Sequence, residues 1–423
     1  MPETSVERSS RAAFRYPNFR YYLLARLLTT ISSEMQSVAV GWQVYAITHR
    51  PLDLGLMGLA QFLPGVCLFL AAGHIADRVA RQRILQTCLV GFSICSSLLL
   101  LFTLNRAAFG HVSVYPIYAV MLLNGTVRAF NAPASQAFLP LLVPREVFPN
   151  AVAWTSSVFQ TAAIAGPMLG GILYGVTGSP VMVYLLAGVA YLGGFFLISG
   201  LRLVVHERPK TAASLGIVLN GLKYIWANKL VLGAISLDLF AVLLGGAVAL
   251  LPVYAREILG VGATGLGVLR SAPGVGAVLT SLAIAHWPLK RRAGLAMLWC
   301  VFGFGVFTIA FGLSRSLAFS LIMLLLIGAS DIISVIVRST MIQLGTPDAM
   351  RGRVSAVNMV FVGASNEVGQ FESGLTAQWF GAVPAVVLGG IGTILIVAAW
   401  ACLFPSLRSL DRLVADKGAS VEE

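Results

Sequence analysis

The sequence predicts an all-α integral membrane protein with twelve transmembrane helices in two six-helix bundles, and three observations lead to this prediction. Hydrophobic residues make up 57% of the 423 residues and charged residues only 11%, whereas about 25% of residues are charged in a typical soluble domain. Twelve apolar runs follow one another along the chain, each near the roughly 20 residues that cross a bilayer. The sixth and seventh runs are separated by the longest polar connection, so the runs divide evenly.

Each predicted span is one of these apolar runs. The spans are 21–47, 54–75, 84–104, 115–139, 151–176, 181–201, 230–254, 265–285, 293–313, 317–337, 354–380 and 383–404. The first bundle therefore covers 21–201 and the second 230–404, with a basic linker at 202–229 and polar end segments at 1–20 and 405–423. We expect both end segments and the linker to lie in the cytoplasm.

The lysines and arginines predict this orientation, because basic residues concentrate in the cytoplasmic loops of membrane proteins. If the loop at 73–83 faces the cytoplasm, most of the 29 basic residues share its side. The opposite side receives only Arg50, Arg106, Arg256 and Arg315. The net charge of +12 is thus spread over short loops, and no basic helix or stripe predicts binding to nucleic acid.

The sequence offers no pattern for an enzyme or a metal protein. The five cysteines all lie inside apolar runs without metal-ligand spacing, so we interpret them as packing residues. No phosphate-binding loop, nucleophile with a base, or HExxH motif is found. We expect no cofactor, and no filter segment indicates a channel.

The two halves of the chain resemble each other weakly, which is typical of transporters built from repeats. The sequence 62–66 aligns with 271–275, through Pro64 and Pro273. A second alignment places Gly125 on Gly328 and Gly166 on Gly369. We infer a duplication of a six-span unit.

The loop at 73–83 combines one acid and three arginines between two apolar runs. A glycine permits close helix packing, and an acid beside the membrane needs a partner such as a helix N-terminus or an arginine. The arginines also fit a plain orientation signal. The candidate gating residues are Gly73, Asp77, Arg78, Arg81 and Arg83.

A second motif lies in the fifth span, where a proline stands among three glycines. The proline removes a backbone donor, and the glycines let a neighbouring helix approach to backbone distance. Generic close packing is the alternative interpretation. The motif residues are Gly166, Pro167, Gly170 and Gly171.

Charged side chains inside the spans are candidates for function, because charge in hydrocarbon is costly. At about 1.5 Å per residue, Glu34, Asp238 and Glu367 all lie near the middle of the membrane. A desolvated carboxylate there gains affinity for protons, although each acid also fits a structural ion pair. Arg270 fits either an anionic substrate or an acid.

Three further charges suit pairing. Asp331 and Arg338 share a helix face in the tenth span, so an ion pair between them is the first interpretation. Arg128 and Asp331 occupy equivalent positions in the two halves, and a pair between those halves is the alternative.

The loop at 73–83 resembles the G-x-x-x-D-R-x-G-R-[RK]-[RK] loop of the major facilitator superfamily, with departures at Ala80 and Gln82. The fifth-span motif resembles the G-P-x-x-G-G core of that family's proton-coupled exporters. The run at 128–134, with 32–36 and 42–45, is similar to the bacterial branch that contains enterobactin-exporter and macrolide-efflux-like proteins.

This resemblance implies a secondary active transporter that exports a hydrophobic or amphipathic small molecule, such as a drug or a siderophore-like compound, by alternating access driven by a proton gradient. A nutrient importer on the same fold is the alternative. We expect a monomer in the bacterial inner membrane, with substrate and lipid as its partners and no nucleic acid. Neutralising Glu34 or Asp238 is expected to abolish transport, and Asp77→Asn to impair switching more than changes at Arg81 or Arg83.

Overall fold

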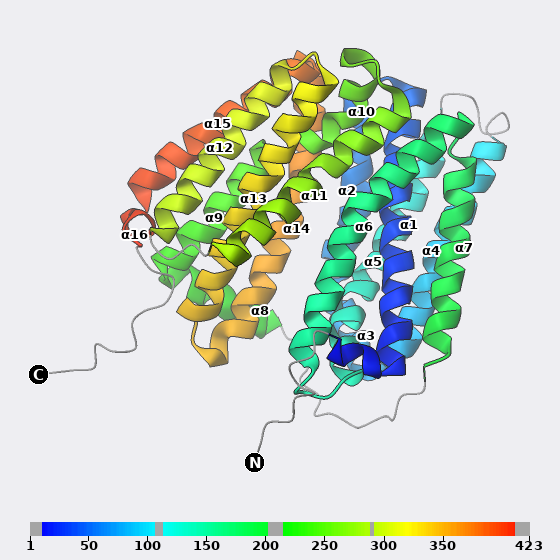
Figure 1. The fold of residues 1–423 in the computed structure, drawn as a ribbon, viewed down its shortest axis with the longest axis horizontal. Helices are drawn as coiled ribbons and strands as arrows, with labels where there is room; N and C mark the ends of the chain where they lie inside the picture. Colours follow the sequence, from blue (N-terminus) through cyan, green and yellow to red (C-terminus); the bar gives the residue numbers. More distant parts are fainter. Residues whose placement is uncertain (1–10, 106–112, 202–214, 288–291, 411–423) are drawn as a thin grey trace, which may run out of the picture. The chain divides into compact units, whose positions relative to one another are not determined.

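The computed structural model describes residues 11–105, 113–201, 215–287 and 292–410. Over these ranges the chain is helical and contains no strand. It divides into two compact units, one formed by Met1–Ala213 with Pro252–Ser271 and the other by Ser214–Leu251 with Ala272–Glu423 (Figure 1). The division at Ala213 lies inside the expected linker. The segment Pro252–Ser271 differs from expectation, because it belongs to the first unit but comes from the second half of the sequence.

Among the described residues, eight helical stretches are long and apolar enough to cross a membrane. They are α4 (Arg81–Leu104), α6 (Phe148–Thr177), α7 (Val181–Ser199), the stretch Lys229–Ile258, α11 (Gly262–His286), α12 (Ala293–Leu313), α13 (Leu317–Gly345) and α15 (Ala382–Leu403). The other four predicted spans are also helical, as α1 (Pro17–Thr48), α2 (Pro51–Cys67) with α3 (Phe69–Arg78), α5 (Tyr115–Phe138) and α14 (Asp348–Phe380). The predicted all-α membrane fold is confirmed.

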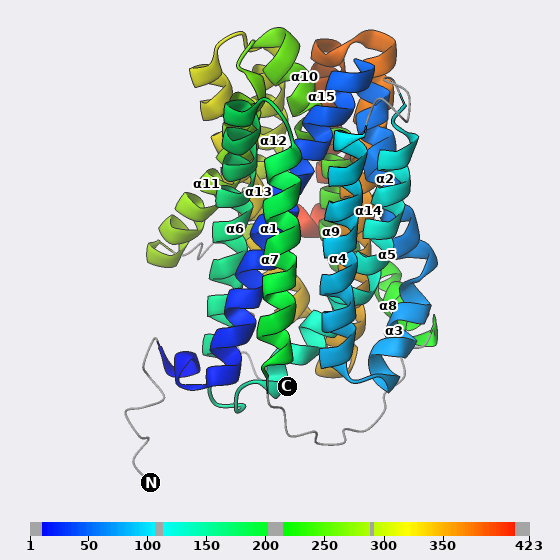
Figure 2. The same ribbon diagram turned by 90° about the vertical axis from the view of Figure 1, so that its right-hand side faces the viewer.

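In the first unit, α1 packs along α6 and α7, α4 packs along α5 and α7, and α2 packs along α5 (Figure 2). Glycines permit the α2–α5 contact: a Cβ added at Gly125 would lie 2.0 Å from the carbonyl oxygen of Gln61. Polar side chains also join helices here, and Ser96 donates to Gln36 Oε1 over 2.6 Å. Small residues and interhelical hydrogen bonds are the usual means of helix packing in membranes.

The second unit repeats this packing order. Here α9 (Lys229–Leu244) packs along α14 and α15, and α12 packs along α13 and α15. Gly328 in α13 lies against Pro273 in α11, so that an added Cβ would be 1.9 Å from the Pro273 carbonyl oxygen. Gly125 and Gly328, which the sequence comparison aligned, thus hold equivalent contacts within their own units, and this supports the duplication.

Two connections differ from expectation. The stretch interpreted as a loop at 73–83 is helical at both ends, since α3 continues to Arg78 and α4 begins at Arg81. Only Val79 and Ala80 connect the two helices. The predicted linker at 202–229 contains a further helix, α8 (Leu215–Ala227), which packs on α14 and α9.

The predicted seventh span is broken in its middle. Helix α9 ends at Leu244, and η4 (Ala247–Leu250), α10 (Leu251–Val253) and the π-helical turn η5 (Tyr254–Ile258) follow. Gly246 packs against α14, where an added Cβ would lie 2.6 Å from Ser373 Oγ. Hydropathy alone does not reveal such a break, because the whole stretch is apolar.

Candidate functional site

Glu34 of α1 and the glycine motif of α6 lie in direct contact. A Cβ added at Gly166 would lie 2.5 Å from Glu34 Cβ and 3.0 Å from the Ile31 carbonyl oxygen. Gly170, one turn further along, faces the Met35 backbone in the same way, at 2.7 Å from its carbonyl oxygen. Two features that the sequence marked separately therefore form one site, in which glycines make room for an acid.

Glu34 belongs to a polar cluster inside the first unit. The Tyr191 hydroxyl of α7 interacts electrostatically with Glu34 of α1 and Arg128 of α5. Tyr191 is almost completely buried, whereas Glu34 is half-buried and Arg128 is exposed. Electrostatic interactions thus connect side chains of three helices, α1, α5 and α7.

The first part of α11 completes this face of the unit. The Arg270 guanidinium donates to Ser37 Oγ over 3.0 Å, and Ser37 lies one helical turn from Glu34 on α1. The next residue, Ser271, donates to the Ile164 carbonyl oxygen of α6 over 2.7 Å. No carboxylate of the described residues forms an ion pair with Arg270. Its guanidinium is hydrogen-bonded to the neutral Ser37 hydroxyl instead.

The other glycine of the motif holds α6 against α11 at backbone distance. A Cβ added at Gly171 would lie 2.6 Å from the Ala263 carbonyl oxygen and 2.7 Å from Gly267 Cα. The carbonyl oxygen of Pro167 in turn faces Gly267, 2.6 Å from the Cβ that a larger residue would place there. The motif therefore packs α6 against α1 on one side and α11 on the other.

We expect Gly171→Ala to destabilise the protein by about 1–3 kcal/mol, since overpacking against a rigid backbone forces the helices apart. Gly65→Ala in α2 is the matched control, because an added Cβ there meets nothing within 4 Å. That control should be neutral or slightly stabilising. Thermal unfolding in detergent measures both, and equal midpoints would contradict the contact.

Asp238 forms a buried ion pair with Arg338, which joins α9 to α13 in the second unit. The two side chains are 6% and 4% exposed. The ion pair predicted between Asp331 and Arg338 is therefore wrong. Asp331 suits Arg338 because helical spacing puts both on one face of α13, and Asp238 suits it because of its predicted depth in the membrane. The sequence does not reveal that the packing of α9 brings Asp238 into contact with Arg338.

The other predicted acids of the second unit are Asp331 and Glu367. Asp331 is half-buried, and no hydrogen bond or ion pair is found for it among the described residues. Glu367 accepts from Gln370 Nε2 at 3.5 Å. Arg128 belongs to the first unit and Asp331 to the second, and the pair between them stays a prediction.

The gating residues of 73–83 differ in their surroundings. Arg81 donates to the Ala137 carbonyl oxygen near the end of α5 over 3.0 Å, whereas Arg78 and Arg83 are exposed and Gly73 is half-buried. The Asp77 side chain lies outside the described residues, and so does 288–291 of the equivalent loop in the second half. The gating role of Asp77 stays a prediction.

Gln82, where the family loop usually has a base, has a structural role. Its Nε2 donates to the carbonyl oxygens of Ile198 and Leu201 over 2.8 and 3.1 Å. These groups lie at the end of α7, where helix carbonyls lack partners. A neutral amide that caps α7 thus explains this departure from the family pattern.

We expect Arg81→Gln to lower stability by about 1–2 kcal/mol, because a charged hydrogen bond to the end of α5 is lost. Arg83→Gln removes the same charge from an exposed position without a partner among the described residues, and should leave stability unchanged. Unfolding midpoints of the two variants test this. An equal loss in both would indicate that the loop acts through its net charge.

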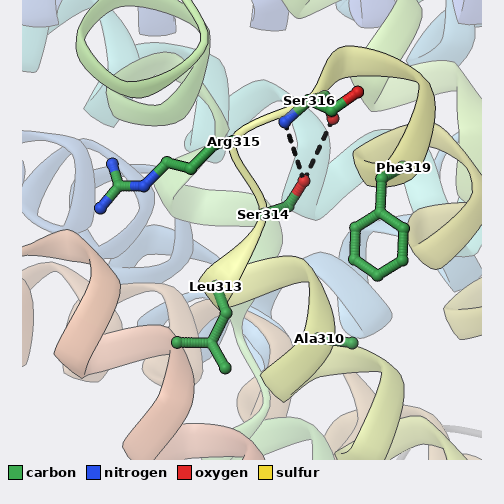
Figure 3. A pocket seen from close by; sticks show the side chains of 6 residues that line it. All are labelled: Ala310, Leu313, Ser314, Arg315, Ser316 and Phe319. Atoms are coloured by element: carbon green, nitrogen blue, oxygen red, sulfur yellow. Dashed lines mark hydrogen bonds between the residues drawn. The ribbon is translucent and has the colours of Figure 1, made fainter.

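A separate pocket opens at the turn between α12 and α13 (Figure 3). It is lined by Ala310, Leu313, Ser314, Arg315, Ser316 and Phe319. The Ser314 hydroxyl donates to the Ser316 carbonyl oxygen over 3.1 Å and shapes the turn. None of the predicted intramembrane acids lines this pocket, so we do not assign it to the candidate site.

The sequence interpretation missed Ser37, which accepts a hydrogen bond from Arg270, and Tyr191, which interacts electrostatically with Glu34 and Arg128. Both are common residue types in membrane helices, and only their contacts distinguish them. No group of three potential metal ligands occurs among the described residues. The candidate site is therefore a polar, glycine-lined face around Glu34, to which Arg270 of α11 is joined through Ser37 and Arg128 of α5 through its electrostatic interaction with Tyr191.

Comparison with known proteins places the chain in a family. The family described as transmembrane secretion effector matches residues 8–420. The enterobactin exporter EntS of Shigella boydii serotype 4 (strain Sb227) is 28% identical over 396 residues, which cover 91% of this chain and 87% of that protein. The enterobactin exporter EntS of Escherichia coli O81 (strain ED1a) shows the same identity and coverage.

Solved structures agree in fold. A bacterial homologue of the human lysosomal transporter Spinster, in an inward-facing and unoccupied conformation, aligns with a TM-score of 0.71 at 15% identity over 93% of this chain and 98% of that chain. A D-xylose–proton symporter aligns with a TM-score of 0.70 at 15% identity, again over 93% and 98%. At these identities the likeness shows the fold alone. The chain therefore belongs to the transmembrane secretion effector family of the major facilitator superfamily, as a multi-pass export transporter.

Proposed function

We propose that this transporter exports a small molecule in exchange for protons, with Glu34 as the proton carrier. The observation that supports this most is the contact between Glu34 and Gly166, which joins an intramembrane acid to the exporter-type glycine motif. Intramembrane acids are commonly functional. Glu34 is half-buried, so the protein does not enclose its side chain completely.

The exchange follows from competition for one carboxylate. An ionised Glu34 accepts hydrogen bonds from donor groups of the substrate, and a protonated Glu34 is a poorer acceptor. A proton that arrives from outside then favours substrate release, and loss of that proton to the cytoplasm restores binding. Binding energy that differs between two states of the carrier is what drives such a cycle.

The substrate class follows from the charges around Glu34. Arg270 is held only by the Ser37 hydroxyl among the described residues, so its guanidinium suits an acidic or carbonyl oxygen of the substrate. A molecule with hydroxyl donors and acidic oxygens matches both groups. Enterobactin is the first compound to test, because two similar proteins are named as its exporters.

The setting of this activity is the inner membrane of a bacterium, with both termini in the cytoplasm and the protein as a monomer surrounded by lipid. The support for the orientation is the distribution of lysines and arginines. No enzymatic step and no cofactor are part of the proposal, and the proton gradient supplies the energy.

The test uses inside-out membrane vesicles that contain the transporter. We expect respiration to drive enterobactin into the vesicles and a protonophore to abolish the accumulation. Accumulation in right-side-out vesicles instead would support the importer alternative. Accumulation that a protonophore leaves unchanged would contradict proton coupling.

A further inference from the structure

Arg26 lies near the start of the first predicted span, about two turns of α1 before Glu34. No carboxylate of the described residues forms an ion pair with it. Its Nη1 donates instead to the Tyr22 hydroxyl over 3.3 Å and to Ser135 Oγ of α5 over 3.0 Å. A charge inside a span is costly unless a partner compensates it. Neutral hydroxyls therefore hold the guanidinium of Arg26, and its positive charge stays uncompensated.

The two hydroxyls have fixed positions of their own. The Tyr22 and Ser135 hydroxyl oxygens lie 2.9 Å apart, and Tyr22 also donates to the Ser135 carbonyl oxygen over 3.2 Å. Tyr22 is 3% exposed, and its ring centre lies 5.5 Å from that of Phe138 of α5. Packing between α1 and α5 thus places the hydroxyls, and the hydroxyls place the guanidinium.

One edge of the Arg26 guanidinium has no partner. Its Nε is buried without a hydrogen bond, and Nη2 donates to none of the described residues. These two nitrogens form the edge of the planar group that can bind both oxygens of one carboxylate. An arginine that extends to the water interface keeps its charged head in water, which the buried Nε contradicts. The unpaired donor edge therefore indicates an acidic ligand.

Arg26 shares one side of α1 with the contact between Ser37 and Arg270. Eleven positions separate Arg26 from Ser37, which is close to three turns and about 16 Å along the helix axis. Both guanidinium groups are hydrogen-bonded to serine hydroxyls, without an ion pair among the described residues. Glu34 comes between them in the sequence. The same type of cationic contact thus occurs near the start of α1 and again near its middle.

We propose that Arg26 binds a carboxylate of the exported molecule on its Nε–Nη2 edge. The proposal rests on the transport function proposed above and adds that the transporter prefers acids to their uncharged analogues. The Arg26 side chain is half-buried, so a small rotation of its planar head presents this edge to a ligand. The ligand then supplies the counter-charge that the protein lacks, and an uncharged analogue cannot do so.

The first test compares an acid with its amide by isothermal titration of the purified protein in detergent. The probes are 2,3-dihydroxybenzoate, which carries hydroxyl donors and a carboxylate, and 2,3-dihydroxybenzamide, which replaces only the carboxylate. We expect the acid to bind more tightly. Arg26→Gln should weaken its binding about tenfold or more, since hydrogen bonds between charged groups are the stronger ones, and should change binding of the amide less than twofold. Equal affinity of the unaltered protein for both probes overturns the proposal.

Arg20→Gln is the matched control for Arg26→Gln. Arg20 also belongs to α1 but is exposed, so its substitution removes the same charge near the same end of the helix. We expect this variant to bind the acid with unchanged affinity. Equal weakening by the two substitutions would indicate general attraction by net charge and would overturn the site.

Thermal unfolding separates a ligand site from a structural arginine. The acid should raise the midpoint of the unaltered protein, because ligands stabilise the state that they bind, but not that of Arg26→Gln. If Arg26→Gln does not fold, Arg26→Lys decides, since it keeps the charge and loses the two-donor edge. We expect that variant to fold and to bind the acid severalfold more weakly. Unchanged acid binding by Arg26→Lys would overturn the role of the edge.

A lipid phosphate offers similar acidic oxygens, and a last measurement distinguishes it from a substrate. Phosphatidylglycerol added to the micelles should change the affinity for 2,3-dihydroxybenzoate less than twofold. Displacement of the acid by this lipid, together with loss of lipid binding in Arg26→Gln, would assign Arg26 to a lipid and overturn its role toward substrate. Absence of acid binding by the unaltered protein overturns the acid site alone, because the vesicle experiment decides proton-driven export independently.

Discussion

Glu34→Gln is expected to stop proton-driven export while the protein stays folded. The substitution keeps the size of the side chain, so its contact with Gly166 is preserved. It removes the group that takes up a proton, and the amide cannot alternate between two charges. Export driven by an imposed pH gradient should fall to the level of vesicles without transporter, and thermal unfolding should change little.

Glu146→Gln is the control for this prediction. Glu146 is an exposed acid in the connection between α5 and α6, so its neutralisation changes the net charge by the same amount outside the spans. We expect native export from that variant. Native export from Glu34→Gln would exclude Glu34 as the proton carrier and would leave the glycine motif as a packing device.

The sequence predicted the helices well because their signal is local. Apolar runs of membrane length specify spans whatever their neighbours are, and the structure has a helix at each of the twelve. The repeat was also visible in the sequence, because Gly125 and Gly328 are glycines at equivalent close helix contacts. Both features are properties of a few consecutive residues.

The site was less predictable because it depends on contacts between distant segments. The sequence marked Glu34 and Gly166 but gave no reason to join them, and helical spacing favoured Asp331 as the partner of Arg338. Which acid reaches Arg338 depends on how α9 packs against α13. The placement of Pro252–Ser271 on the first unit also had no sequence signal, because an apolar stretch is compatible with either neighbour.

The second large effect concerns Asp238, and here the expected result is a loss of folding. Asp238 and Arg338 are both buried, and Arg338 Nε has no hydrogen-bond partner among the described residues. Asp238→Asn therefore leaves a buried guanidinium without a counter-charge. Removing one partner of a buried pair costs about 3–5 kcal/mol, and the unfolding midpoint and the yield of monodisperse protein should both fall.

A double variant separates the two roles that the sequence left open for Asp238. Replacing a buried ion pair by apolar residues of similar size is often neutral or stabilising, so Asp238→Leu with Arg338→Met should restore the unfolding midpoint. If Asp238 is structural, proton-driven export returns with the fold. If Asp238 carries protons, the double variant folds but does not export, and Glu34 cannot be the sole carrier. A midpoint that stays low would contradict the ion pair itself, because the apolar replacement removes the uncompensated charge.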